Sequence, residues 1–346
     1  MQYVIEQIEK NQNITKEQLE FLLGTRDTEI IEYLHERARE TAQKIYGNKI
    51  YIRGLIEFTN YCKNDCFYCG IRCSNASAER YRLTEEEILE CCQRGYEMGF
   101  RTFVLQGGED PYYTRERICS VVKHIREAYS DCAITLSVGE WERESYQKFY
   151  EAGANRYLLR HETADEEHYR KLHPSRMNYN HRMECLKDLK EIGYQVGCGF
   201  MVGSPFQTIE TLYKDILFIK EFKPQMVGIG PFIPQKDTPF GQKKAGEVET
   251  TLKLLSIIRL LEPGILLPAT TALGTIHPKG REMGILSGAN VVMPNLSPEN
   301  VRNKYTLYDN KKSTGTEAAE GLKDLKKRMV AIGYEVVTDR GDYPFV

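Results

Sequence analysis

Four cysteines lie close together at positions 62, 66, 69 and 73. The first three have the spacing Cys-x3-Cys-x2-Cys, and Tyr68 directly precedes the third. Three thiolates can hold a four-iron cluster and leave one iron open to a small molecule. Zinc and a ferredoxin-type cluster are the alternatives, although no second cysteine pair follows for zinc and no proline follows Cys73. The spacing alone leaves open whether Cys73 is a fourth ligand.

The composition is that of an ordinary globular protein and limits the possible partners. The 346 residues include 41% hydrophobic and 28% charged residues, with a net charge of −2. Charges of both signs are interspersed, so we expect no nucleic-acid surface. No run of 18 apolar residues and no targeting signal is visible, so we expect no membrane contact and a cytoplasmic location. Ten cysteines in that compartment are expected to be reduced.

From residue 50 onward, short apolar segments alternate with segments of helical periodicity. This alternation is typical of parallel strands covered by helices, and eight units in about 250 residues match an α/β fold, the (βα)8 TIM barrel. The last two strands are the weakest, so an open barrel of six strands is the alternative. The predicted strands are residues 51–58, 102–106, 133–137, 156–160, 196–202, 226–232, 266–270 and 290–294.

Helical segments flank the barrel in the sequence. Residues 1–49 predict an N-terminal helical extension, in which Thr15 begins one helix with a capping box and Gly47 ends another. The barrel is predicted over residues 50–300. Residues 301–346 are expected to form a C-terminal helix and a polar tail that pack on the barrel, within one structural domain.

Polar and glycine-rich residues follow the predicted strands at their carboxyl ends. The cysteines follow the first strand, Gly107 to Pro111 the second, and Arg160 to Thr163 the fourth. Active sites of TIM barrels lie at this end of the strands. The distribution therefore favours an enzyme.

The cysteine spacing, with Tyr68 and its place after the first strand, resembles the signature of the radical S-adenosylmethionine (SAM) enzymes. The resemblance implies one 4Fe–4S cluster on Cys62, Cys66 and Cys69, whose open iron binds SAM. A fourth protein thiolate would close that iron, so Cys73 is expected to lie outside the cluster. It further implies that an electron from the cluster cleaves SAM to methionine and a 5′-deoxyadenosyl radical, which attacks a substrate in the barrel.

The same resemblance implies a set of SAM contacts. Residues 107–109 resemble the GGE motif that receives the methionine amino group, Glu162 the acidic residue near the ribose or amino end, and Arg182 the arginine that pairs with the SAM carboxylate. The alternatives are an exposed helix charge for Arg182, an ion pair for Glu162 and core packing for Met201. The full set is Tyr68, Gly107, Gly108, Glu109, Ser137, Glu162, Arg182 and Met201.

Longer stretches between residues 50 and 310 resemble the HydE family of iron-iron (FeFe) hydrogenase maturases, among them AGANRYLLRHETA, MVGIGPFIPQKDTP and LPATTALGTI. This resemblance implies assembly of the hydrogenase H-cluster, from a small cysteine-bound iron carbonyl-cyanide precursor. The implied partners are other hydrogenase maturases, bound transiently, and an electron donor such as ferredoxin or flavodoxin. 3-Methylornithine synthase and biotin synthase, with an amino-acid-like substrate or sulfur insertion, are the related alternatives. A non-enzymatic electron-transfer protein is the third.

The HydE resemblance also implies a substrate and anion pocket inside the barrel. Its arginines and threonine hydroxyls suit an anionic ligand that contains sulfur. A strand-end pair is the alternative for Thr270 and Thr271, and aromatic packing for Tyr305 and Tyr308. We expect His161 to be a packed residue rather than a catalytic base. The implied pocket residues are Arg53, Gln106, Thr135, Arg160, Met226, Thr270, Thr271, Tyr305 and Tyr308.

Overall fold

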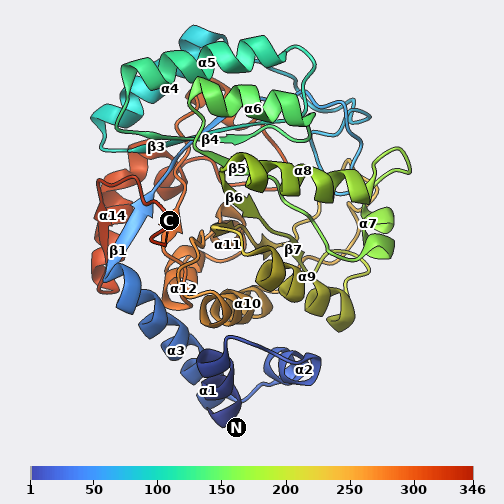
Figure 1. The fold of residues 1–346 in the computed structure, drawn as a ribbon, viewed down its shortest axis with the longest axis vertical. Coiled ribbons are helices and arrows are strands. Elements are labelled where there is room, and N and C mark those ends of the chain that lie inside the picture. The colour runs from blue at the N-terminus through green and yellow to red at the C-terminus, as the bar shows by residue number, and fades with distance from the viewer. Residues whose placement is uncertain (1, 346) are drawn as a thin grey trace.

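A ring of parallel strands, with helices on its outside, occupies the middle of the molecule (Figure 1). The computed structural model describes residues 2–345. The longest sheet has the order β2-β3-β4-β5-β6-β8. Its strands are β2 Gly54–Thr59, β3 Thr102–Gly107, β4 Ala133–Ser137, β5 Arg156–Leu158, β6 Gln195–Cys198 and β8 Met226–Val227.

The other strands form two smaller sheets. β7 Met201–Val202 pairs with β9 Gly230–Pro231. β1 Lys49–Ile52 lies between β10 Val291–Val292 and β11 Glu335–Val337. The predicted strands 51–58, 196–202 and 226–232 are therefore each divided into two short strands that pair with different partners.

The ring closes through residues 265–269, as the (βα)8 prediction requires. Leu266 forms an isolated bridge to Met226 of β8, and Pro268 forms one to Val291 of β10. A further bridge joins Leu55 of β2 to Asn295. Pro268 lacks an N–H to donate, which explains why the predicted strand 266–270 forms bridges rather than a continuous ladder. The closed barrel is confirmed, and the alternative with six strands is wrong.

Helices surround the ring and continue at both ends of the chain. Thr15 caps its helix with the predicted capping box, and Gly47 follows the third helix with φ +59°. No helix within residues 2–345 is long and apolar enough to cross a membrane. The helices are α1 Gln2–Asn11, α2 Lys16–Gly24, α3 Thr28–Tyr46, α4 Glu85–Glu97, α5 Arg115–Ala128, α6 Arg143–Ala152, α7 Glu166–Leu172, α8 Tyr179–Ile192, α9 Ile209–Phe222, α10 Val248–Leu261, α11 Thr271–Ile276, α12 Gly280–Leu286, α13 Glu299–Arg302 and α14 Leu322–Ala331, with the 3-10 turns η1 Gly315–Glu317 and η2 Ala319–Gly321.

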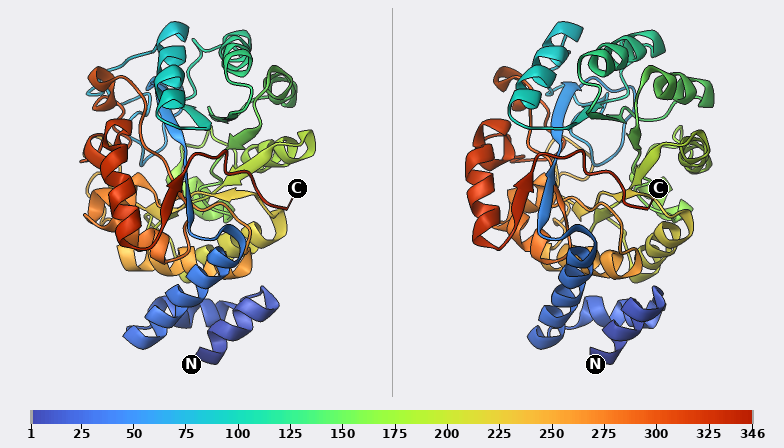
Figure 2. Two further views of the ribbon diagram at one scale, coloured as in Figure 1. Left: turned by 90° about the vertical axis from the view of Figure 1, so that its left-hand side faces the viewer. Right: turned by 60° about the vertical axis from the view of Figure 1, so that its left-hand side comes forward.

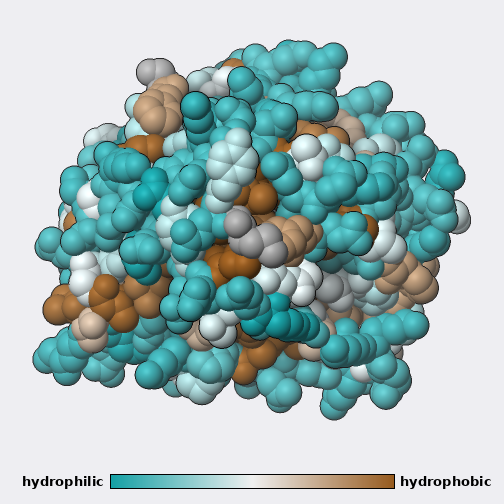
Figure 3. Space-filling model, turned by 90° about the horizontal axis from the view of Figure 1, so that it is seen from below, coloured by the Kyte–Doolittle hydropathy of each residue, from teal (hydrophilic) through white to brown (hydrophobic). Residues whose placement is uncertain are grey.

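The three N-terminal helices project from one side of the barrel (Figure 2). α3 packs along α10, where His35 Nδ1 lies 2.8 Å from Ser256 Oγ. Lys253, also on α10, donates to the Leu23 and Thr25 carbonyls at the end of α2. The face seen from below is mostly hydrophilic, with apolar side chains in small separate groups (Figure 3).

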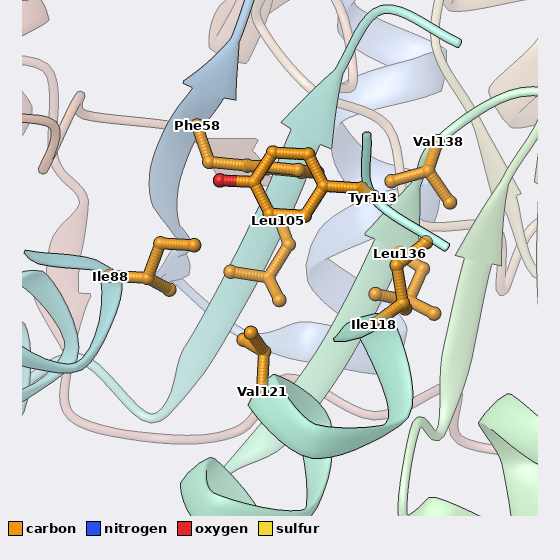
Figure 4. A pocket seen from close by; sticks show the side chains of 8 residues that line it. All are labelled: Phe58, Ile88, Leu105, Tyr113, Ile118, Val121, Leu136 and Val138. Carbon is orange, nitrogen blue, oxygen red and sulfur yellow. The ribbon is translucent and has the colours of Figure 1, made fainter. Parts of the chain in front are cut away.

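Side chains alternate between the outside and the inside of the ring. Leu105 of β3 and Leu136 of β4 pack outward against α5, around a void of only about 10 Å³ (Figure 4). Because consecutive strand residues point to opposite faces, Gln106 and Thr135 point inward. The apolar outer layer thus aims polar side chains into the barrel.

Residues 335–345, here called the floor segment, cross the N-terminal ends of the strands. The Thr102 hydroxyl donates to the Arg340 carbonyl at 2.8 Å. Arg156, fully buried, donates to the Gly341 carbonyl at 3.1 Å and contacts Asp342 at 2.7 Å. The sequence predicted a polar tail here but not the strand β11 that begins this segment.

Candidate active site

Arg80 fixes the loop after β2, residues 60–80, here called the cluster loop. Its guanidinium donates to four backbone carbonyls at 2.5 to 3.2 Å, those of Asn60, Ile71, Arg72 and Asn75. A charged donor that satisfies several carbonyls holds a loop without regular secondary structure. The cluster loop therefore has a defined shape built from its own side chains.

The three predicted ligands share one environment. Burial raises the pKa of the Cys69 thiol to about 12, and the neighbouring Cys62 adds to this. Burial also raises the pKa of Cys66, which is close enough to both other cysteines to be affected by their charge. Such thiols release protons when they bind iron. Within residues 2–345, no three Cys, His, Asp or Glu side chains surround a single-ion position; a cluster does not require this, because each thiolate binds a different iron.

Cys73 faces a different environment from the other three. It is exposed, and Arg176 Nη2 lies 3.3 Å from its sulfur. Its N–H donates to the Asn64 carbonyl at 2.8 Å. This placement favours the predicted set of three ligands, and the donor set fits a 4Fe–4S cluster with one open iron.

The end of β3 lies directly against the cluster loop. A Cβ on Gly108 would lie 2.1 Å from the Tyr61 carbonyl oxygen and 2.7 Å from Cys62 Cβ, so only glycine fits. The Lys63 N–H donates to the Glu109 carbonyl at 2.9 Å. The predicted GGE motif and the first predicted cluster ligand are therefore neighbours.

Two ion pairs, one mostly buried and one partly buried, lie near this junction. Arg182 is 7% exposed, pairs with Glu140 and donates to the Arg160 carbonyl at 2.8 Å. The alternative of an exposed helix charge for Arg182 is wrong. Arg160 Nη2 lies 3.1 Å from Glu162 Oε2, so the ion pair named as the alternative for Glu162 does form. Neither of these two atoms has a well-aligned hydrogen bond among the described residues, which leaves both able to contact a ligand.

The other predicted SAM contacts lie at the same end of the ring. Tyr68 and Met201 belong to one apolar group that includes Phe232. The Tyr68 hydroxyl lies 3.1 Å from His173 Nε2. Ser137 is the last residue of β4 and pairs with Gln106 of β3. Met201 is buried in this apolar group, so the packing role named as its alternative does occur.

A depression of about 750 Å³ opens beside the cluster loop. Glu109 and Glu140 lie on its wall, so it borders the predicted SAM contacts. Its volume is in the range of small-molecule sites. Glu140 follows β4 and was not assigned a role from the sequence; only its position after a strand could have indicated one. The lining residues are Lys63, Asn64, Glu109, Glu140, Trp141, Glu142, Arg176, Met177, Asn178, Asn180, His181 and Glu184.

Unpaired donors point into the barrel below this end. Arg53 crosses the interior and contacts the Met226 sulfur at 2.9 Å, on the opposite side of the ring. Burial and the nearby Arg156 lower the pKa of Arg53. Arg53 Nε, Arg53 Nη2 and Thr135 Oγ1 are buried without a hydrogen-bond partner in residues 2–345, and so is Thr270 Oγ1 at the start of α11. Unsatisfied buried donors are costly, and an anion would satisfy them.

Residues 303–312, here called the lid segment, cross the C-terminal end of the ring. Tyr305 is buried and its hydroxyl lies 3.5 Å from Gln106 Nε2. Lys311 Nζ lies 2.7 Å from the buried Glu57. The Gly70 N–H donates to the Leu307 carbonyl at 2.9 Å, which joins the lid segment to the cluster loop.

Not every predicted pocket residue lies with Arg53. Thr270 caps α11 and Thr271 is the first residue of that helix. Tyr308 belongs to the lid segment, where burial raises the pKa of its hydroxyl. Arg160, a predicted substrate residue, contacts Glu162, a predicted SAM contact, so the two sets of residues adjoin at this ion pair. Sequence reasoning missed Glu57 and Lys311, because a lysine in a polar stretch carries no signal of burial.

His161 is packed, as expected from its place between Arg160 and Glu162. It is fully buried, and its Nε2 lies 3.3 Å from Asp215. Its Nδ1 accepts from the Gly199 N–H at 3.2 Å. Both ring nitrogens therefore have structural contacts.

Comparison with known proteins gives consistent results. The radical SAM superfamily model matches residues 56–219. The chain is 47% identical over 308 residues to the [FeFe] hydrogenase maturase subunit HydE of Thermotoga maritima, covering 89% of this chain and 87% of that protein. It is 31% identical over 332 residues to 3-methylornithine synthase of Methanosarcina acetivorans, covering 95% and 92%.

Solved structures show the same architecture. The crystal structure of methylornithine synthase (PylB) superposes with a TM-score of 0.86 at 29% identity, covering 96% of this chain and 97% of that one. The maturase HydG has a TM-score of 0.78 at 24% identity, covering 96% of this chain and 74% of that one, which supports the fold alone. The chain therefore belongs to the radical SAM superfamily, whose enzymes use a 4Fe–4S cluster and SAM, and within it is similar to the hydrogenase maturase HydE.

Proposed function

We propose that this radical SAM enzyme acts in assembly of the FeFe-hydrogenase H-cluster, on a small cysteine-bound iron carbonyl-cyanide precursor. The 47% identity to a HydE maturase over most of both chains supports the pathway. The observation that carries the substrate class is the presence of unpaired buried donors on barrel residues, those of Arg53 and Thr135. These donors suit an anionic ligand, and the Met226 sulfur beside Arg53 suits one that contains sulfur or iron.

The residues of this chain have distinct roles in the proposal. Cys62, Cys66 and Cys69 would hold the cluster, which when bound supplies the electron that cleaves SAM to a 5′-deoxyadenosyl radical. Gly107 to Glu109 and Arg182 would orient SAM beside it. Tyr305 and the Glu57–Lys311 pair cover the interior and would exclude water from the substrate.

The partners and location complete the proposal. Other hydrogenase maturases would deliver or receive the small iron-containing compound, and ferredoxin or flavodoxin would reduce the cluster. The reaction would take place in the cytoplasm.

The test is incubation of the cluster-loaded enzyme with SAM, reductant and the candidate iron-cyanide precursor. Mass spectrometry and electron paramagnetic resonance should detect a substrate-derived radical or product. SAM cleavage without any change in the precursor would contradict the proposed substrate.

Methylornithine formation is the second candidate. It is favoured by the TM-score of 0.86 and the near-complete mutual coverage with methylornithine synthase. Methylornithine in the product mixture, when amino-acid substrates replace the iron compound, would establish it instead.

A further inference from the structure

Phe206 is held at the surface in an unusual backbone conformation. It lies between β7 and α9, has φ +67°, and is 52% exposed. Bulky residues rarely adopt positive φ, so the exposed side chain of Phe206 comes with an unfavourable backbone conformation. Gln207 fixes the loop, because its side chain donates to the Met201 carbonyl at 2.8 Å and accepts from the Gly203 N–H at 2.6 Å. The loop thus stabilises an exposed aromatic ring.

Two ring contacts connect Phe206 to the cluster loop. Its ring centre lies 6.1 Å from that of Phe240, which lies 6.0 Å from that of Phe67. Phe67 stands between the predicted ligands Cys66 and Cys69. Backbone hydrogen bonds hold this row in place, since Phe67 donates to the Leu172 carbonyl and Phe240 donates to the Phe67 carbonyl. The exposed Phe206 ring is therefore connected to the predicted cluster position through only two ring contacts.

Lysines flank the exposed ring. Lys243 Nζ lies 5.3 Å and Lys171 Nζ 6.0 Å from the centre of Phe206. Lys171 also pairs with Glu167, whereas Lys243, next to the Lys244–Glu247 pair, has no ion pair of its own within residues 2–345. Phe206, Phe240, Lys171 and Lys243 are here called the Phe206 patch. An apolar centre with a charged edge is the usual anatomy of a transient protein interface.

We infer that the Phe206 patch is the docking surface for a small acidic electron-transfer protein that carries a flavin or an iron–sulfur cluster. In the transfer, the donor loses one electron and the cluster on Cys62, Cys66 and Cys69 gains it. The lysines attract the acidic partner, and Phe206 brings its redox group close to the cluster loop. The inference rests on the proposed radical SAM chemistry, which requires a reduced cluster.

The test compares two reductants on the cluster-loaded full chain. Flavodoxin hydroquinone tests docking, and dithionite reduces the cluster without it. The variants are Phe206→Gly, which suits the backbone conformation, and the double change Lys171→Glu with Lys243→Glu. We expect flavodoxin-driven formation of 5′-deoxyadenosine to fall about tenfold at low ionic strength in the double variant. The dithionite-driven rate should stay within about twofold, as for any surface change that leaves the site intact.

A matched control is the double change Lys123→Glu with Lys327→Glu, at two exposed lysines on α5 and α14. This control should keep both rates. Equal losses with both reductants, or no loss with flavodoxin, would overturn the inference. A change in self-association alone, measured by sedimentation of Phe206→Gly, would instead show that the patch binds a second copy of this chain.

Binding of oxidised flavodoxin, measured by calorimetry, separates this inference from the proposed function. Binding that the double variant weakens would support docking even if the parent chain formed no methylornithine and no modified iron compound. Equal binding by parent and double variant would reject the docking surface while leaving the radical chemistry intact.

Discussion

Arg80 shows how a single side chain can prepare a metal site before the metal arrives. Its four hydrogen bonds to backbone carbonyls organise the loop that carries the cysteines. The cysteine spacing indicated a metal cluster, and the resemblance to radical SAM enzymes implied which three cysteines would hold it. It did not predict Arg80, since an arginine that binds carbonyls looks like any surface charge until the loop is folded. The same holds for Glu140, which pairs with Arg182.

Replacement of Cys69 by serine should abolish the cluster, because serine removes one of the three thiols that are predicted to bind iron. Iron content and the reduced-cluster electron paramagnetic resonance signal would measure the loss. Cys73→Ser is the matched control and should keep both, since Cys73 is exposed and contacts Arg176. Cluster loss in the control would show that Cys73 is a fourth ligand.

Replacement of Gly108 by alanine should impair SAM cleavage while the chain stays folded. The added methyl group would overlap the Tyr61 carbonyl and Cys62, and a displacement of about 1 Å at a reacting centre can lower rates a hundredfold. Formation of 5′-deoxyadenosine with dithionite measures the effect. Gly24→Ala, where no atom lies within 4 Å of the new methyl, should be unaffected. Full activity in the Gly108 variant would contradict the predicted SAM contact.

The barrel elements were largely predictable because each strand and helix has its own periodicity. Their exact limits were not, since three predicted strands each divide into two with different partners and Pro268 interrupts a fourth. The packing of α3 against α10 is one of the contacts that join the N-terminal helices to the barrel. His35 lies between α3 and α10, and burial, with Lys253 adding to it, lowers the pKa of His35 to about 4.

This interface should make stability depend on pH. His35 is neutral in the folded chain down to about pH 4, whereas an unfolded histidine gains a proton near pH 6.5. The unfolded state therefore binds more protons between these values, and the free energy of unfolding should fall as pH falls through this window, by up to about 3 kcal/mol. Urea unfolding at pH 7, 5.5 and 4.5 would measure it. His35→Gln should flatten this part of the profile, and His277→Gln, at an exposed site, should not.

At the scale of the whole molecule, contacts between distant parts of the chain complete the barrel. The floor segment closes one end and the lid segment the other, and neither was predictable in detail. β11 has three residues in a polar stretch, and Lys311 meets Glu57 only after the ring has formed. Such pairings have no local pattern, because both partners look like ordinary charged residues.

Replacement of Asp342 by asparagine should lower stability, because Asp342 is the acidic partner of the fully buried Arg156. The remaining carbonyl contacts of Arg156 and the partial exposure of Asp342 limit the loss to about 1–3 kcal/mol. Thermal unfolding measures the change. Asp324→Asn, at an exposed position on α14, is the control. An unchanged melting temperature would show that the carbonyls alone stabilise Arg156.

The position of β1 between β10 and β11 has a consequence for incomplete chains. Both neighbours of this first strand come from the last fifth of the sequence. A fragment cut before residue 289 would carry β1 with its two edges unpaired, and such edges recruit strands from other molecules. Proteolytic fragments and stalled chains of this protein should therefore be prone to aggregation, whereas the full chain covers that edge with its own residues.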